Sequence, residues 1–236
     1  MAHAGANKIT RVQLAEIVTP EATDTFRPIP HHELINTLTE TLSFRHIQIV
    51  QEEYAVTPDG SKMFGLLGLD ATFLDCRFSI GVRNAHDKSM RLGLVAGYRV
   101  FVCDNMAFQG EFHPVLAKHS KKFNLQDALT LGVDRIQRNW NPLKEALEHR
   151  RNFELTEDQA RLKIYEAFLG GRFPIKLMKG VDKEFFQPQY EEFKPKTLWS
   201  LENAFTSTFK QLKPVPQYQA TASLGKFMND ITPPFN

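Results

Sequence analysis

The chain has little cysteine and no long apolar run. Its 236 residues include only Cys76 and Cys103, with no Cys-x-x-Cys pair of the kind that binds zinc or forms a redox couple. We therefore expect two buried thiols rather than a disulfide framework. No stretch approaches the roughly 18 consecutive apolar residues that a membrane-spanning helix requires, and residues 1–8 lack the apolar core of a signal peptide. These absences predict a cytoplasmic protein with no membrane partner.

Signature motifs of several enzyme classes are also missing. The sequence contains no Gly-x-Gly-x-x-Gly, no Gly-Lys-Ser/Thr and no Gly-x-Ser-x-Gly. Nucleotide hydrolysis, dinucleotide redox chemistry and ordinary serine esterase chemistry are therefore disfavoured. The eight histidines show neither His-x-x-x-His nor His-Glu-x-x-His spacing. We accordingly predict no metal site and no cofactor.

The composition is that of a folded protein, but the charges are unevenly distributed. Hydrophobic residues make up 42% of the chain and charged residues 24%, and the net charge is only +2. Residues 1–76 carry 5 basic against 10 acidic side chains, whereas residues 77–151 carry 13 against 7. A basic middle segment can supply a footprint for phosphates even in a nearly neutral protein. The alternative is that the acidic first third folds over the basic middle and neutralises it.

The hydrophobic pattern predicts an α+β fold with an antiparallel sheet. Residues 1–30 contain Thr19-Pro20 and Arg27-Pro28-Ile29-Pro30 without a sustained period, which indicates an extended arm that a neighbouring subunit could hold in a homo-oligomer. A short amphipathic helix follows, and from residue 46 the period changes to two. About four or more strands joined by short links follow, and the last of them begins at Leu92. Such short links favour antiparallel pairing.

Helices are expected to pack on this sheet and to form the C-terminal part. A long helix begins after the N-cap residue Asn124, and Pro142 should divide it near Asn141. A capping box at Thr156 opens a second helix, and a third spans roughly residues 198–212. The resulting organisation is an extended arm (1–30), an α+β core (31–151), a helical C-terminal part (152–213) and a loop-rich tail (214–236).

The most polar segment lies between two strongly apolar strands. It runs from Arg83 through Asn84, His86 and Asp87 to Lys88 and contains a candidate acid, base and cation. Arg83 and Lys88 could bind phosphate, with His86 as a proton shuttle. The alternative is a solvated hairpin loop, because asparagine and aspartate are ordinary turn formers.

Two further polar segments follow the last long strand. Asp104, in Cys103-Asp104-Asn105, either begins a turn or acts in catalysis. Lys118, His119, Lys121 and Lys122 precede the Asn124 helix, and lysines before a helix N-terminus form a plausible phosphate site, although most basic clusters are simply solvated. The candidate catalytic residues are therefore Arg83, Asn84, His86, Asp87, Asp104 and His119.

Aromatic residues near cations provide a second indication of nucleic acid. Phe101 or Tyr98 could stack on bases beside the basic side chains. Phe185, Phe186, Tyr190 and Phe193 also interleave with lysines, although core packing of these rings is the alternative. The candidate nucleic-acid-binding residues are Arg83, Lys88, Arg91, Arg99, Phe101, Lys118, Lys121 and Lys122.

Several segments resemble the family known as domain of unknown function 932, whose members are encoded by plasmids, phages and integrated elements. The similar segments are Thr25–His31, Met63–Gly65, Gly81–Ser89, Val100–Asn105, Lys118–His119 and Trp199–Thr206. Position 86 and the residue after Lys118-His119 vary in that family, so His86 is a weaker catalytic candidate than Arg83, Asn84 or Asp87. The resemblance implies no established activity. It implies a mobile-element setting in which replication, recombination and defence are common tasks.

Three functional hypotheses follow. The first is a non-enzymatic mobile-element protein that binds nucleic acid, with single-stranded DNA favoured because no helix-turn-helix or zinc-finger pattern is present. The second is a phosphodiester- or nucleotide-processing enzyme, with Asp87 or Asp104 as base or metal ligand, Arg83 stabilising charge and His86 or His119 as acid. The third is a protein-binding inhibitor of a host defence factor, which would use the acidic first third as its contact surface.

Overall fold

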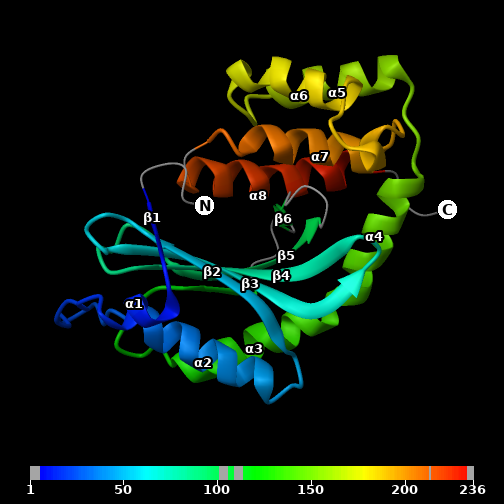
Figure 1. The fold of residues 1–236 in the computed structure, drawn as a ribbon. Coiled ribbons are helices and arrows are strands. Elements are labelled where there is room, and N and C mark those ends of the chain that lie inside the picture. The colour runs from blue at the N-terminus through cyan, green and yellow to red at the C-terminus, as the bar shows by residue number, and fades with distance from the viewer. Residues whose placement is uncertain (1–5, 101–105, 109–113, 213, 233–236) are drawn as a thin grey trace. The chain divides into compact units, whose positions relative to one another are not determined.

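The computed structural model describes residues 6–100, 106–108, 114–212 and 214–232 (Figure 1). The chain divides into two compact units. The first, here called the sheet unit, comprises residues 1–98 and 112–139. The second, the helical unit, comprises residues 99–111 and 140–236. The expected α+β class, with an antiparallel sheet and a helical C-terminal part, is confirmed.

The sheet unit is built around antiparallel strands in the order β1-β2-β3-β4-β5, with β7 paired to β5. The strands are β1 (Asn7–Ile9), β2 (Ile49–Val56), β3 (Lys62–Phe73), β4 (Cys76–Ala85), β5 (Leu92–Val100) and β7 (Val115–Ala117). Short turns join β2 to β3 and β3 to β4, as antiparallel neighbours permit. In the first of these turns Gly60 has a φ of 69°, a left-handed conformation that glycine adopts without strain.

The described residues of the sheet unit form three helices. They are α1 (Arg11–Ala15), α2 (His31–Ser43) and α3 (Leu125–Arg138). Both α2 and α3 lie on the same face of the sheet (Figure 1), and Arg45, just after α2, donates from Nε to Asp134 of α3 at 2.6 Å. The expected N-cap of α3 is confirmed, because Asn124 accepts a hydrogen bond from the backbone N–H of Asp127. The long helix is divided as expected, two residues before Asn141: α3 ends at Arg138 with Asn139 as its C-cap, and a new helix begins at Trp140. Pro142 then lies in the first turn of that helix, where its missing N–H is no loss.

The helical unit buries a core rich in phenylalanine. Its elements are β6 (Met106–Phe108), α4 (Trp140–Asn152), α5 (Glu157–Leu169), η2 (Ile175–Leu177), α6 (Met178–Phe186), η3 (Glu191–Phe193), α7 (Leu198–Phe209) and α8 (Pro214–Ile231). Phe173 lies at the centre of an aromatic cluster, with its ring centroid 5.3 Å from Phe205 and 5.2 Å from Phe209. Phe185 and Phe193 are also buried. For Phe185 and Phe193, and for the partly buried Phe186 that packs against the same cluster, core packing is thus the alternative observed.

Two expectations about chain ends need correction. The sequence predicts a tail that is mostly loop, but residues 214–231 form the helix α8, which buries Leu224 and Met228. Pro214 and Pro216 do not interrupt this helix because both lie in its first turn, where proline is tolerated. The N-terminal arm is not extended throughout, because residues 7–9 add a strand to β2 and residues 11–15 form α1. No helix among the described residues is long and apolar enough to cross a membrane.

Candidate nucleic-acid interface

A buried polar network connects three distant segments of the sheet unit. Asn84, near the end of β4, is completely buried. Its Nδ2 donates to the carbonyl oxygen of Ile29 at 2.8 Å and to Nδ1 of His31 at 2.9 Å. Its Oδ1 accepts from Nε2 of His119 at 2.6 Å. One amide side chain therefore holds the arm, the start of α2 and the segment before α3 against the sheet.

Two histidine rings complete this network. His86 donates from Nε2 to the same Ile29 carbonyl at 2.9 Å, and His31 donates from Nε2 to the carbonyl of Gly60 at 3.0 Å. The His31 and His86 rings stack in parallel planes, with their centroids 3.9 Å apart. These bonds require only neutral imidazoles, because each ring donates from Nε2 and His31 accepts at Nδ1.

The electrostatics of the network favour those neutral rings. Burial, followed by the proximity of His86, lowers the pKa of His31 from 6.5 to about 4. Burial also lowers the pKa of His86 and of His119. None of the described residues forms a group of three or more histidine, cysteine or carboxylate side chains placed to bind a metal ion. The network of Asn84, His31, His86 and His119 therefore holds backbone carbonyls in place with neutral side chains.

The buried network places the arm beside the segment that precedes α3. The backbone N–H of Arg27 donates to the carbonyl of His119 at 3.0 Å, and the ring of Phe26 packs on the imidazole of His119. Lys88, at the tip of the β4–β5 hairpin, holds its ammonium 5.1 Å from the centre of the Phe26 ring. Its φ of 63° is a left-handed conformation within this tip. The cations Arg27 and Lys88 are thus brought close to a third segment that is rich in lysine.

A basic groove opens between the arm with the start of α2 on one side and the segment that precedes α3 on the other. Its volume is about 750 Å³, and three cationic side chains line it: Arg27, Lys121 and Lys122. The remaining lining residues are Pro28, Ile29, Pro30, Glu33, Thr37, Ser120, Phe123, Asn124, Leu125 and Gln126. All of them belong to the sheet unit. Glu33 is the one carboxylate among these lining residues.

The first turn of α3 forms one end of the basic groove. Asn124, Leu125 and Gln126 lie there, and the helix continues for fourteen residues. The backbone N–H groups of a first helical turn carry partial positive charge and favour an anion. Asp24 lies 3.9 Å from the ammonium of Lys121, but both side chains are largely exposed, so this contact is a weak one. The basic groove therefore combines side-chain and backbone groups suited to phosphate.

Four of the candidate catalytic residues, Asn84, His86, Asp87 and His119, are bound to neighbouring groups of the fold. Asn84, His86 and His119 belong to the buried network. Asp87 accepts hydrogen bonds from Ser89 and pairs with Lys62 at 3.1 Å. Burial acts to raise the pKa of Asp87, but the bonds from Ser89 and Lys62 outweigh it and lower that pKa. Asp104 lies outside the described residues.

Arg83 lies within β4, and its side chain extends over Gly93 of the neighbouring strand β5 rather than toward the hairpin tip. A Cβ atom at Gly93 of β5 would lie 2.9 Å from its Nε, so this glycine makes room for the arginine side chain. Arg83 and the candidate histidines do not form a shared open site.

The candidate nucleic-acid-binding residues are only partly brought together. Lys121 and Lys122 line the basic groove, and Lys88 reaches Phe26 beside it. Lys118 and Arg91 are exposed on the same unit. Arg99 belongs to the helical unit, Phe101 lies outside the described residues, and the Tyr98 side chain is buried and unavailable for base stacking.

Sequence reasoning missed Arg27, Phe123 and His31. The sequence pattern marks Arg27 only as part of a proline-rich arm, although this residue stands in one of the segments that carry the family resemblance. Phe123 directly follows Lys121-Lys122 and could have been found as an aromatic residue adjoining the lysine cluster. His31 gives no sequence signal for its pairing with Asn84, because the two residues are 53 positions apart.

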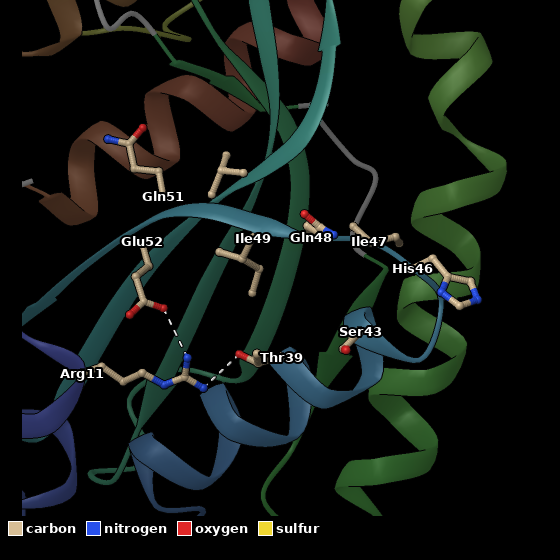
Figure 2. A pocket seen from close by; sticks show the side chains of 10 residues that line it. Arg11, Thr39, Ser43, His46, Ile47, Gln48, Ile49, Gln51 and Glu52 are labelled. Carbon is tan, nitrogen blue, oxygen red and sulfur yellow. Dashed lines mark hydrogen bonds and ion pairs between the residues drawn. The ribbon is translucent and has the colours of Figure 1, made fainter.

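A second hollow lies along β2, and its polar groups bind one another (Figure 2). Its volume is about 600 Å³, and its walls come from α2 and from residues 46–52. Arg11 donates to Glu52 at 3.4 Å, to Asn36 at 3.0 Å and to Thr39 at 3.0 Å. Ile49 and Glu52 point toward α2, whereas Gln51 points to the opposite face (Figure 2). Because Arg11 is held by three side chains, this hollow offers fewer free cationic donors than the basic groove.

No family model matches the chain, and neither a curated protein nor a solved structure matches it. The resemblance to domain of unknown function 932 therefore stays a prediction.

Proposed function

We propose that the protein binds single-stranded nucleic acid, with DNA favoured, through the basic groove. The observation that supports this proposal is the convergence of Arg27, Lys121 and Lys122 on the first turn of α3 within one hollow of about 750 Å³. Arginine and lysine side chains provide the salt-dependent phosphate attraction that dominates nucleic-acid affinity. The helix N-terminus adds backbone donors directed at the same place.

Phe123 supports the preference for a single strand. Its partly exposed ring lines the basic groove beside Lys122. An unpaired base can stack on such a ring while its phosphates contact the neighbouring cations, whereas bases inside a duplex are already stacked. Lys88 and Lys118 are exposed nearby in the sequence segments that meet at Phe26 and His119, and they would extend the phosphate path. A role in replication, recombination or defence of a mobile element is the wider setting that the resemblance implies.

In this proposed function the protein binds the strand without cleaving it. The candidate acids and bases among the described residues are bound to structural partners: His86 to the carbonyl of Ile29, His119 to Asn84, and Asp87 to Ser89 and Lys62. A general base must reach the proton that it removes. Cleavage of the bound strand would favour the enzymatic hypothesis instead.

The test is a titration of labelled single-stranded and duplex DNA by fluorescence polarisation at two salt concentrations, with a gel to detect cleavage. We expect salt-dependent binding of intact single-stranded DNA. The double substitution Lys121→Gln and Lys122→Gln should weaken binding and reduce the dependence of log K on log salt by about 0.7 for each phosphate that is no longer neutralised. Phe123→Leu should weaken single-strand binding at any salt concentration, whereas Phe123→Tyr, which keeps an aromatic ring, should bind as the wild type does.

The matched control is Lys176→Gln with Lys179→Gln. These two lysines are exposed on the helical unit and change the net charge by the same amount. Equal reductions in affinity from both double variants would mean that net charge, not the basic groove, controls the affinity. Absence of binding to either form of DNA would refute the proposal.

A further inference from the structure

Helix α5 of the helical unit has apolar residues on two opposite faces. Its inner face places Ala160, Ile164 and Phe168 in the hydrophobic core. Its outer face carries Leu162, Tyr165 and Leu169, whose exposed fractions are 56%, 50% and 63%. A helix on the surface of a monomer ordinarily presents charged or polar residues on its outer side.

These three residues form one stripe. Their spacings of three and four positions place them in successive turns on a single side of α5. We call Leu162, Tyr165 and Leu169 the outer stripe. A scattered exposed leucine needs no explanation, but adjoining exposed apolar side chains mark an interaction surface. The helix lies beside α6 within the helical unit (Figure 1).

We propose that the outer stripe is the contact surface of a homodimer, in which α5 helices of two copies pack antiparallel about a two-fold axis near Tyr165. The stripe is self-complementary in this arrangement because Leu162 and Leu169 lie at similar distances on either side of Tyr165. Each Leu162 would meet the partner's Leu169, and the two tyrosine rings would meet near the axis. Such an interface is closed, because the same patch is used by both copies.

The charges around the outer stripe fit a second copy in antiparallel orientation. Asp158 precedes Leu162 by one turn on the same side of the helix, and Arg172 follows just after the helix ends. Antiparallel packing places Asp158 near the partner's Arg172 at both ends of the contact. Parallel packing would instead place like charges together.

Arg172 retains the donors that this contact needs. One of its terminal nitrogens, Nη1, donates to Asp230 at 3.0 Å, and its guanidinium carbon lies 5.5 Å from the centre of the Phe227 ring of α8, but its side chain is still 37% exposed. A guanidinium carries five N–H donors, so a second carboxylate can bind the same side chain. The opposed directions of the two α5 macrodipoles add to the preference for antiparallel packing.

This inference goes beyond nucleic-acid binding and does not depend on it, because all its residues belong to the helical unit. The contact involves few side chains, so we expect a weak, concentration-dependent dimer. Two copies joined in this way would also carry two basic grooves in one assembly, which raises the avidity for a long strand.

The first test is sedimentation velocity of the full chain over a concentration series. We expect reversible dimerisation, and the double substitution Leu162→Lys and Leu169→Lys should weaken it by about tenfold or more. The matched control is Leu131→Lys on α3, where a leucine is exposed to a similar extent, 55%, in the other unit. A wild-type chain that stays monomeric throughout, or a control that is equally disruptive, would overturn the proposal.

The second test reverses the charges. In an Asp230→Asn background, which removes the carboxylate that Arg172 already contacts, Asp158→Lys and Arg172→Asp should each weaken the dimer at low salt. Combining them in one chain should restore it, because each end then pairs opposite charges again. Circular dichroism of each variant checks that the helices are intact. Dimerisation that the combined variant does not recover would overturn the antiparallel arrangement, even if the leucine variants fail to fold.

Discussion

Asn84 shows how one buried amide can organise a surface. Its three hydrogen bonds bind the arm through Ile29, the start of α2 through His31 and the segment before α3 through His119. Each bond contributes little by itself, but a buried polar group without a partner costs about 1–3 kcal/mol. The network therefore fixes where Arg27 lies relative to Lys121 and Lys122.

The neutral histidines of the network predict that acid destabilises the fold. The pKa of His31 is lowered from 6.5 to about 4 by burial, and burial also lowers the pKa of His86 and His119. The unfolded chain therefore binds more protons than the folded chain below pH 6.5. The contribution of the neutral histidines to the free energy of unfolding should be complete above pH 6.5 and should decrease as the pH is lowered toward about 4. For His31 the slope should approach roughly 1.4 kcal/mol per pH unit between these two pH values, and His86 and His119 should add to it in the same direction.

Urea unfolding across this pH range measures the slope. His86→Phe keeps a ring stacked on His31 but removes one titrating group, so its slope should be smaller. The control is His46→Asn, because His46 is exposed and has a φ of 57°, which asparagine tolerates. A free energy of unfolding that stays constant from pH 6.5 to 4 would contradict the neutral network.

Among the helices and strands, α3 depends on a glycine where it crosses β7. A Cβ atom at Gly132 would overlap Cγ2 of Val115. Glycine in a helix interior ordinarily costs about 1 kcal/mol relative to alanine, so its presence here is explained by close packing. We expect Gly132→Ala to destabilise the protein by roughly 1–3 kcal/mol despite the better helix propensity of alanine.

A double-mutant cycle separates packing from propensity at this position. Val115→Ala alone should also destabilise the protein, because it removes a buried side chain. Combined with Gly132→Ala it should recover part of the stability, since the new methyl group fills the vacated space. Additive destabilisation in the double variant, measured by urea unfolding, would show that the two residues do not compete for the same space.

Elements with strong local signals were predictable from the sequence. The cap at Asn124 and the capping box of Thr156 and Gln159 are confirmed, because these bonds join residues three positions apart. The prediction of a looped tail is wrong because Pro214 and Pro216 look like helix breakers unless the start of the helix is known. What places α8 is the burial of Leu224 and Met228 in a distant core, which no local pattern records.

For the whole molecule, sequence proximity and spatial proximity give different information about the candidate site. Lys121 and Lys122 are adjacent in sequence and could be identified as a pair. Arg27 lies more than ninety positions earlier, and the buried network together with the bond from its backbone N–H to the carbonyl of His119 brings it to the same groove. Burial also reverses the interpretation of His86 and His119, which look like exposed catalytic groups in the sequence but are core residues in the fold. Such long-range pairings have no local signature.

The division into two units predicts that the helical unit can fold without the sheet. The hydrophobic cluster of this unit is drawn from residues 155–228, and the backbone bonds between Leu155 and Lys196 and between Phe153 and Leu198 lie within the same span. The buried pair of Arg150 and Glu202, joined at 2.9 Å, is also internal to residues 140–236.

A fragment comprising residues 140–236 should therefore be helical by circular dichroism and unfold cooperatively in urea. In this fragment Phe205→Ala should lower the free energy of unfolding by about 3–5 kcal/mol, because the Phe205 ring is completely buried among other aromatic rings. The matched change Tyr165→Ala, on the exposed outer stripe, should have little effect at concentrations where the fragment is monomeric. A gradual, non-cooperative transition would mean that residues 99–111 or the sheet unit complete the core.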